Sequence, residues 1–414
     1  MEERFVGEKA LRENFPEIPV SEELFARFES SAKQSDRFAV LVIRIDDFEE
    51  MLKDSGEDVT SGIVLRLARM LDDVAKTCPM KWGRLDEKHF ACFCPELDEA
   101  AAVELARQIQ HRFSLPGEET VSIGLAVYPF WPFERTSIPA NAQKALDHAA
   151  FFGGNTITPF DAVSLNISAD KLYQYGDIYG AIEEFKKALM VDTQNVNVHN
   201  SLGVCYGVQG SFDKAIDAFK TATSLDPKDV MATYNLGLAH LRKGNNDKAL
   251  GLFLDAHGLD GDHPDISCQI GLCYREMGQT DTAIEYLEKA ARNKPKGGRV
   301  FRTLGDCYVE KEMLREATKA YEKAIKNHPT DAKSLSALGH LYGALGENIE
   351  IAIVLARESA AIDPDNGLYR SRLGKLYFQN RELEKALEQF QKASELGEDC
   401  GESIGEVESA IADS

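Results

Sequence analysis

The chain has 414 residues, 43% of them hydrophobic, and a formal net charge of −21. Charge of this sign is repelled by phosphate backbones and by anionic lipid surfaces, so nucleic acid and membrane are excluded as expected partners. No run of about 18 apolar residues is present, and the segment from Met1 to Leu11 lacks the apolar core of a secretory signal. We therefore expect a cytoplasmic protein of two or three domains.

The first 160 residues are predicted to contain a helical lead-in, 1–35, and an α/β domain, 36–160. Residues 38–45 form an apolar, β-branched run that is typical of a buried strand. The elements expected after it are helix 63–75, strands 80–85 and 89–94, helix 100–113, strand 120–128, helix 140–152 and strand 156–160. Strands that alternate with helices around a central hairpin indicate an α/β sandwich with a mixed sheet.

Four stretches of this domain carry a family pattern. They read F-A-V-L-V-I-R-I-D-D-F at 38–48, G-R-L-D-E-K-H-F at 83–90, V-S-I-G-L-A-V at 121–127 and A-Q-K-A-L-D-H-A-A-F-F-G-G-N at 142–155. In their order and their anchor residues they resemble the GGDEF (diguanylate cyclase) domain. A different ferredoxin-like domain is the alternative.

The resemblance implies a chemistry whose residues are replaced here. The family joins two GTP molecules with the help of a divalent metal, which needs hard oxygen ligands. The two ligand positions are Arg44 and Lys88, and their positive charges oppose metal binding. Asp46, the second acid of the strand motif, is retained. The other departures from the family pattern are Leu52 and Ser61 at the guanine-reading positions, Asp86, Glu87 and His89 in the signature, and Ala150 and Gly154 at the phosphate positions. We predict a pseudoenzyme with no catalytic residue, metal or cofactor.

A glycine recurs through the rest of the chain with a nearly constant period. The spacings are 34, 34, 34, 34 and 35 residues, between Gly203, Gly237, Gly271, Gly305, Gly339 and Gly374. A fixed period of this size indicates stacked units, each unable to bury its apolar face alone. The pattern around each glycine resembles the tetratricopeptide repeat (TPR), a pair of antiparallel helices. We predict an all-α TPR solenoid over 162–400.

Seven repeats are expected, and a capping helix is expected over 401–414. The repeats begin near Ala162, Val196, Val230, Pro264, Gly298, Ala332 and Gly367. Three cysteines, Cys205, Cys273 and Cys307, recur two residues after the repeat glycine, which is typical of a small buried residue rather than a metal ligand. The junction near residue 160 is too short for a free tether, so we expect the sandwich to pack against the first repeat.

The inner groove of such an array is the predicted binding surface. Residues on the first helix of each repeat are expected to face this groove. Repeats two to four contribute apolar side chains and asparagines, and repeats five to seven contribute cations. Those residues are Asn197, Asn200, Val204, Tyr234, Leu238, Leu241, Arg242, Leu272, Arg275, Arg299, Arg302, Lys333, His340 and Lys375. The alternative is that the apolar members only pack between helices. The pattern favours a peptide or helix with an apolar stretch followed by acidic residues.

These observations favour a non-catalytic adaptor or scaffold in bacterial signalling or cell organisation. The domain that resembles a cyclase would act as a capping or partner-binding module. Two alternatives remain, namely a receptor that binds GTP or cyclic di-GMP without turnover, and an active diguanylate cyclase with unusual ligands. The sequence does not identify the partner protein or the oligomeric state.

Overall fold

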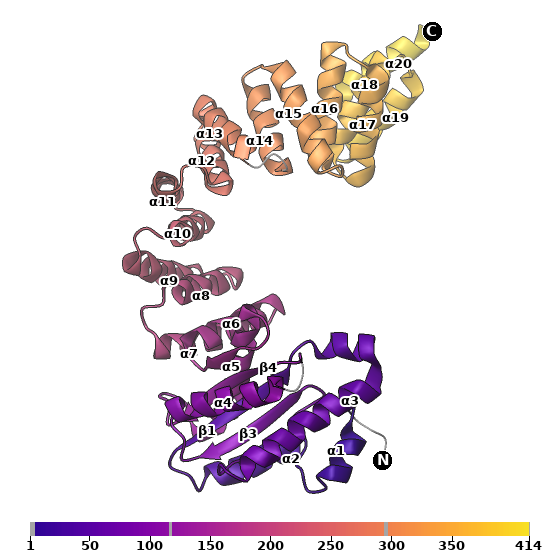
Figure 1. Cartoon of the computed structure of the whole chain (residues 1–414). Helices are drawn as coiled ribbons and strands as arrows, with labels where there is room; N and C mark the ends of the chain where they lie inside the picture. Colours follow the sequence, from indigo (N-terminus) through magenta and orange to yellow (C-terminus); the bar gives the residue numbers. More distant parts are fainter. Residues whose placement is uncertain (1–4, 116–117, 294–296, 414) are drawn as a thin grey trace. The chain divides into compact units, whose positions relative to one another are not determined.

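The computed structural model describes residues 5–115, 118–293 and 297–413. It divides into two compact units, 1–227 and 228–414, which are described separately (Figure 1). Both have the predicted fold class, since the first contains a mixed sheet with helices and the second consists of helices. The predicted lead-in is described from residue 5 and the predicted cap up to residue 413.

The first unit is built on a five-stranded sheet with the order β2-β3-β1-β4-β5. The central strand β1 pairs antiparallel with β3 and β4, whereas β5 runs parallel to β4. The β2–β3 hairpin carries the signature residues in its turn. The strands are β1 (Phe38–Ile45), β2 (Lys81–Arg84), β3 (His89–Pro95), β4 (Val121–Tyr128) and β5 (Ile157–Pro159).

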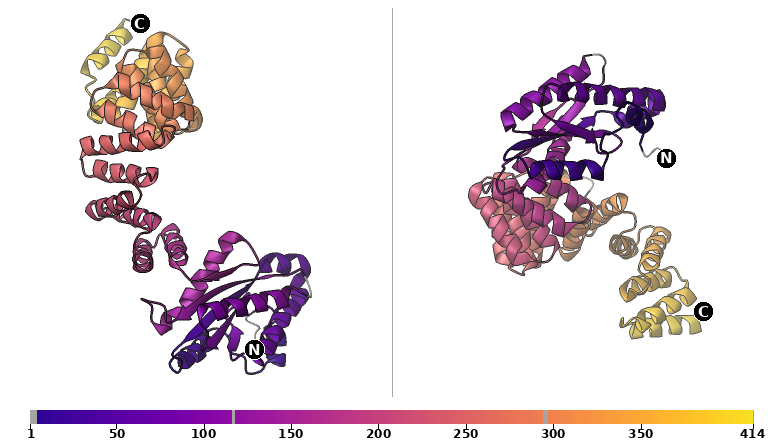
Figure 2. Two further views of the ribbon diagram at one scale, coloured as in Figure 1. Left: turned by 60° about the vertical axis from the view of Figure 1, so that its left-hand side comes forward. Right: turned by 90° about the horizontal axis from the view of Figure 1, so that it is seen from below.

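Helices cover both faces of this sheet (Figure 2). Side chains of β1 alternate between the two faces: Leu41 and Ile43 join one core with α1, α3 and α4, while Val40 and Val42 join another with α2 and α5. The apolar run of β1 is continuous because both of its faces are buried. The helices are α1 (Glu8–Asn14), α2 (Glu22–Ala32), α3 (Phe48–Ala75), α4 (Glu99–Ser114) and α5 (Ile138–Ala149), and two short 3₁₀ turns, η1 (Arg135–Ser137) and η2 (Ala150–Phe152), flank α5.

Helix α3 is longer than predicted. It begins at Phe48 rather than near residue 63, and it contains a break at Gly56, where φ is 79° and ψ is 174°. The segment before Ile63 carries many exposed polar and acidic residues, so it lacks the apolar periodicity on which the prediction rested.

The sandwich packs directly against the first helical repeat, as the short junction predicts. Helices α5 and α6 (Ala162–Gln174) are in contact, and α7 (Ile178–Val191) and α8 (Val196–Val208) continue the same apolar cluster. Asp161 caps α6 by accepting a hydrogen bond from the Ser164 backbone N–H at 2.8 Å. Across the contact, Lys144 and Glu184 form an ion pair at 2.7 Å, with both side chains largely buried.

Glycine sets the spacing of the paired helices. In the pair formed by α8 and α9 (Phe212–Leu225), a Cβ atom on Gly203 would lie 2.6 Å from a ring carbon of Phe219. A larger residue would push the two helices apart. This close approach accounts for the recurrence of glycine at a fixed interval.

The second unit continues the pattern of antiparallel pairs. Each helix contacts the partner that follows it, and α20 packs on α19 at the C-terminal end. The elements are α10 (Val230–Arg242), α11 (Asn246–Leu259), α12 (Pro264–Glu276), α13 (Thr280–Asn293), α14 (Gly298–Glu310), α15 (Leu314–Asn327), α16 (Ala332–Leu345), α17 (Ile349–Ile362), α18 (Gly367–Gln379), α19 (Leu383–Glu395) and α20 (Gly401–Ala412). In the part of the chain that the structure describes, no helix is both long and apolar enough to cross a bilayer.

Candidate functional site

The retained acid Asp46 is buried at the end of β1, where it accepts several hydrogen bonds. It accepts from the Thr120 hydroxyl at 2.9 Å, the Ser122 hydroxyl at 2.8 Å and the Asn155 backbone N–H at 2.7 Å. The Arg44 guanidinium lies 3.3 Å from the same carboxylate. Asp46 is therefore surrounded by donors from this chain, and it ties β1 to β4 and to the segment before β5.

The hairpin turn contains two further ion pairs. Lys88 Nζ lies 2.5 Å from a carboxylate oxygen of Glu49 at the start of α3, and hydrogen bonding to Lys88 lowers the pKa of Glu49. Asp86 accepts hydrogen bonds from the backbone N–H groups of Lys88 and His89, both at 3.1 Å, and its carboxylate lies 2.8 Å from His89 Nδ1. Lys88 and Asp86 of the turn are thus paired within the chain.

Arg84, just before this turn, is fully buried and joins the hairpin to the N-terminal segment. It donates to the carbonyl oxygens of Asp86 at 2.9 Å and Glu87 at 2.5 Å, and also to that of Val6 at 2.9 Å. Burial lowers the pKa of Arg84 to about 10. Its Nη1 is a buried atom without a hydrogen-bond partner. Val6 lies 78 positions away in sequence, so residue spacing could not reveal this contact.

The N-terminal segment also contacts one of the positions expected to read guanine. Gly7 has a φ of 73°, and a Cβ atom there would lie 3.1 Å from the Ser61 Cα. Leu52, the other such position, packs half-buried against the same core as Val6. By contrast, Ala150 and Gly154 are exposed. Residues 5–8 therefore lie between Ser61 on α3 and the hairpin, which was not predicted.

The predicted groove residues of the first unit lie on α8. Asn197 is exposed, whereas Asn200 and Val204 are half-buried. In the second unit, Tyr234 is only 9% exposed and packs against Phe253 with ring centroids 5.6 Å apart. Tyr234 therefore contributes to the core between helices. Among the other predicted residues there, Leu238, Leu241 and Leu272 are half-buried, and Arg242, Arg299, His340 and Lys375 are exposed.

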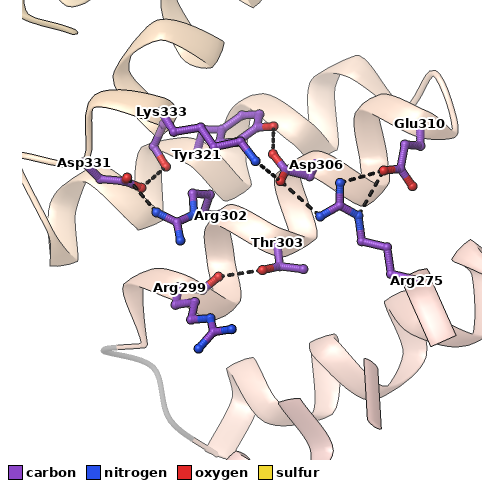
Figure 3. Close-up of polar contacts among 10 residues, drawn as sticks. Arg275, Arg299, Arg302, Thr303, Asp306, Glu310, Tyr321, Asp331 and Lys333 are labelled. Atoms are coloured by element: carbon purple, nitrogen blue, oxygen red, sulfur yellow. Dashed lines mark hydrogen bonds and ion pairs between the residues drawn. The ribbon is translucent and has the colours of Figure 1, made fainter. Parts of the chain in front are cut away.

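Two of the predicted cations take part in a polar network around Asp306, a residue that the sequence analysis did not single out (Figure 3). Asp306 lies 3.2 Å from Arg275 and 2.8 Å from Lys333, and it accepts a hydrogen bond from the Tyr321 hydroxyl at 2.7 Å. Burial, followed by this hydrogen bond, raises the pKa of Tyr321 far above its usual value. The carboxylate of Asp306 therefore neutralises Arg275 and Lys333, two of the cations that were expected to face the groove.

Two more acids pair with predicted cations. Arg275 also forms an ion pair with Glu310 at 2.7 Å, and Arg302 forms a separate pair with Asp331 at 2.7 Å. Figure 3 shows the Arg299 guanidinium making no contact with these acids. The paired residues come from successive repeats, since first helices of neighbouring units lie side by side. Acids at matching positions one repeat away were the signal that could have predicted this neutralisation.

Comparison with known proteins agrees with this architecture. Residues 20–155 match the family model of the diguanylate cyclase GGDEF domain, and residues 202–264 and 274–341 match two tetratricopeptide repeat models. The chain carries a GGDEF domain followed by tetratricopeptide repeats. No curated protein matches it.

Several solved structures resemble parts of the chain. The crystal structure of MamA is 33% identical, with 40% of this chain and 96% of MamA covered and a TM-score of 0.37. For YrrB, described as a TPR protein with an unusual peptide-binding site, the identity is 20%, the coverage 45% and 95%, and the TM-score 0.40. PilF of Pseudomonas aeruginosa is 19% identical, with 53% and 97% covered and a TM-score of 0.47.

Proposed function

We propose that this protein is a non-catalytic adaptor in signalling or cell organisation. The GGDEF domain serves as a folded module that caps the repeat array, and the inner surface of the array binds a peptide or helix of a partner protein. The observation that carries the proposal is the replacement of both metal-ligand positions by cations that pair with acids of this chain.

The residues at the hairpin do not fit a divalent cation. Mg²⁺ needs several oxygen ligands in a near-octahedral arrangement. Here Arg44 and Lys88 stand at the ligand positions, and the oxygens nearest to them, on Asp46 and Glu49, already accept from these cations. Within the described ranges, no group of three or more histidine, cysteine or acidic side chains is arranged to hold a metal.

Two further features of the domain disfavour nucleotide binding. Residues 5–8 lie beside Ser61, so the chain's own backbone occupies space next to a position that the family uses for the base. The carboxylates of Asp86 and Glu87 stand where the family has glycines, and they repel phosphate oxygens. A nucleotide would have to displace residues 5–8 and bind despite the repulsion between its phosphates and the carboxylates of Asp86 and Glu87.

The repeat array supports the binding half of the proposal. Tetratricopeptide repeats generally mediate protein or peptide binding, and YrrB is described as having a peptide-binding site. The exposed and half-buried side chains on the first helices are those expected to meet a guest. An extended segment or an amphipathic helix fits such a groove better than a small metabolite.

Calorimetry of the full chain with GTP and Mg²⁺, and separately with cyclic di-GMP, tests the proposal. We expect no heat of binding at high-micromolar ligand, and no cyclic di-GMP formed on prolonged incubation with GTP. An active GGDEF protein measured in parallel provides the positive control. Saturable heat without product would replace the adaptor by a nucleotide receptor, and product formation would establish an enzyme.

A further inference from the structure

Arg372 on α18 is a half-buried cation that forms no ion pair in the described part of the chain. Its single hydrogen bond goes from Nη1 to the hydroxyl of Ser336, a fully buried residue on α16, at 3.1 Å. A guanidinium carries five N–H donors in a rigid fork. A desolvated charge is normally accompanied by a counter-charge, because removing it from water is costly.

Two more basic side chains lie beside it. His340 follows Ser336 by one turn on α16, and Lys375 follows Arg372 by three residues on α18, which places each on the same helical face as its predecessor. Helices α16 and α18 are in contact. Partial desolvation, and then the charges of Arg372 and Lys375, lower the pKa of His340, although its side chain remains exposed at the surface. Across residues 297–413, neither His340 nor Lys375 forms a hydrogen bond or ion pair.

Two acids on neighbouring helices already have partners. One oxygen of Asp306 accepts from Tyr321 and the other lies against Arg275 and Lys333, while Asp331 is paired with Arg302. The charges of Asp306 and Glu398 act on Arg372, but neither acid forms an ion pair with it in the described part of the chain. The surplus positive charge on α16 and α18 is unusual in a chain with a net charge of −21.

We propose that Arg372, His340 and Lys375 form a carboxylate-binding subsite for an acidic segment of a partner polypeptide. The inference rests on the proposed peptide-binding function and specifies where the acidic residues of the guest bind. The Arg372 fork can hold a carboxylate through two parallel hydrogen bonds while Ser336 fixes its orientation. Lys375 and His340 add charge and a ring N–H from the two sides.

The test uses random peptides displayed on phage and selected against the full chain. One selected peptide is then synthesised with its acidic residues intact and with each of them changed to glutamine. Affinities are measured for the wild-type chain, for the double variant Arg372→Gln/Lys375→Gln, and for the control Lys319→Gln/Lys326→Gln. The control removes the same charge from exposed lysines of α15. Circular dichroism melting establishes that both variants are folded.

We expect acidic residues to be enriched among the selected peptides. The acidic peptide should bind Arg372→Gln/Lys375→Gln about tenfold more weakly or worse, and the control should bind like the wild type. The glutamine peptide should not distinguish the three proteins. Selection of peptides that lack acidic residues and bind the wild type and the double variant equally would overturn the subsite alone. An equal loss of affinity in the control variant would do the same. Failure to select any peptide would also overturn the proposed peptide-binding function.

Discussion

Two alanine substitutions in one helix should change stability in opposite directions. Gly203 and Gly207 are one turn apart on α8, so Gly203→Ala and Gly207→Ala are the same chemical change in nearly the same position. A Cβ atom on Gly203 meets the Phe219 ring, whereas one on Gly207 meets nothing within 4 Å apart from its chain neighbours and the backbone of its own helix. The pair of variants therefore isolates the contact from the intrinsic helix preference of alanine.

The size of the expected stability change follows from the distance between the added Cβ atom and the Phe219 ring. Ordinary contacts begin at 3.4 Å and the Gly203 contact would be 2.6 Å, so the ring has to move by 0.8 Å. Phe219 is only 4% exposed, and overpacking of this kind costs about 1–3 kcal/mol. Alanine in a helix interior gains about 1 kcal/mol over glycine. We expect Gly203→Ala to lose about 1 kcal/mol and Gly207→Ala, near the helix end, to gain about 0.5 kcal/mol.

Hydrogen–deuterium exchange of the α8 and α9 amides measures the change in local stability. A local measurement suits a repeat array, whose unfolding need not be two-state. A factor of ten in protection corresponds to about 1.4 kcal/mol. If Gly203→Ala protects the amides as well as Gly207→Ala does, the aromatic contact does not set the helix spacing.

Four other perturbations test the rest of the structure. Asp46→Ala should destabilise the GGDEF domain by about 3–5 kcal/mol, because it leaves Arg44 and three donors without their acceptor. Urea unfolding followed by tryptophan fluorescence reports on this domain, which contains both tryptophans, and a loss below about 1 kcal/mol would argue against a structural role of the hydrogen bonds to Asp46. The junction near residue 160 should resist limited proteolysis in the wild type and be cut faster after Lys144→Ala, which breaks the pair with Glu184. Burial raises the pKa of Cys205, Cys273 and Cys307 to about 11, so these thiols should react with a disulfide reagent at pH 8 only after unfolding, while half-exposed Cys78 reacts first. Finally, the pKa of His340 is lower in the folded chain than in the unfolded chain, so the unfolded chain binds a proton at a higher pH and stability should fall as the pH drops below 6.5 towards the folded pKa. Arg372→Gln should raise the pKa of His340 in an NMR titration, and an unchanged pKa would show that the two side chains are not close.

Local sequence patterns were sufficient to predict most of the secondary-structure elements. The strands at 38–45, 89–94 and 120–128 were predictable because long apolar runs need burial on both faces, and the structure has them within about one residue of the predicted ends. The helix before Ile63 was missed because an acidic, exposed segment has no apolar stripe. Propensity and periodicity do not report on such a helix, which is held by its continuation into a buried one.

Contacts distant in sequence limited the prediction of the sites. Arg44 and Lys88, which the family resemblance places at the expected metal-ligand positions, were visible in the sequence, but their pairing with Asp46 and Glu49 was not. In the array, Arg275, Arg302 and Lys333 were expected to offer positive charge, and the structure places acids of neighbouring repeats against them. Arg372 went unnoticed because its significance lies in the absence of such a partner, a property that only the surrounding side chains define.

The packing of α5 against the sheet and against the first repeat constrains several residues of the GGDEF domain. Gly124 of β4 is retained where a Cβ atom would lie 2.1 Å from the Leu146 backbone nitrogen, so α5 can lie close against the sheet. The other side of α5 meets α6, and the apolar face of the first repeat is thereby buried in the same cluster as the sheet. An array of stacked repeats needs its first unit covered to stay soluble. That requirement constrains Gly124 and the alanines of α5 but places no demand on Arg44 in β1 or on Lys88 in the hairpin turn.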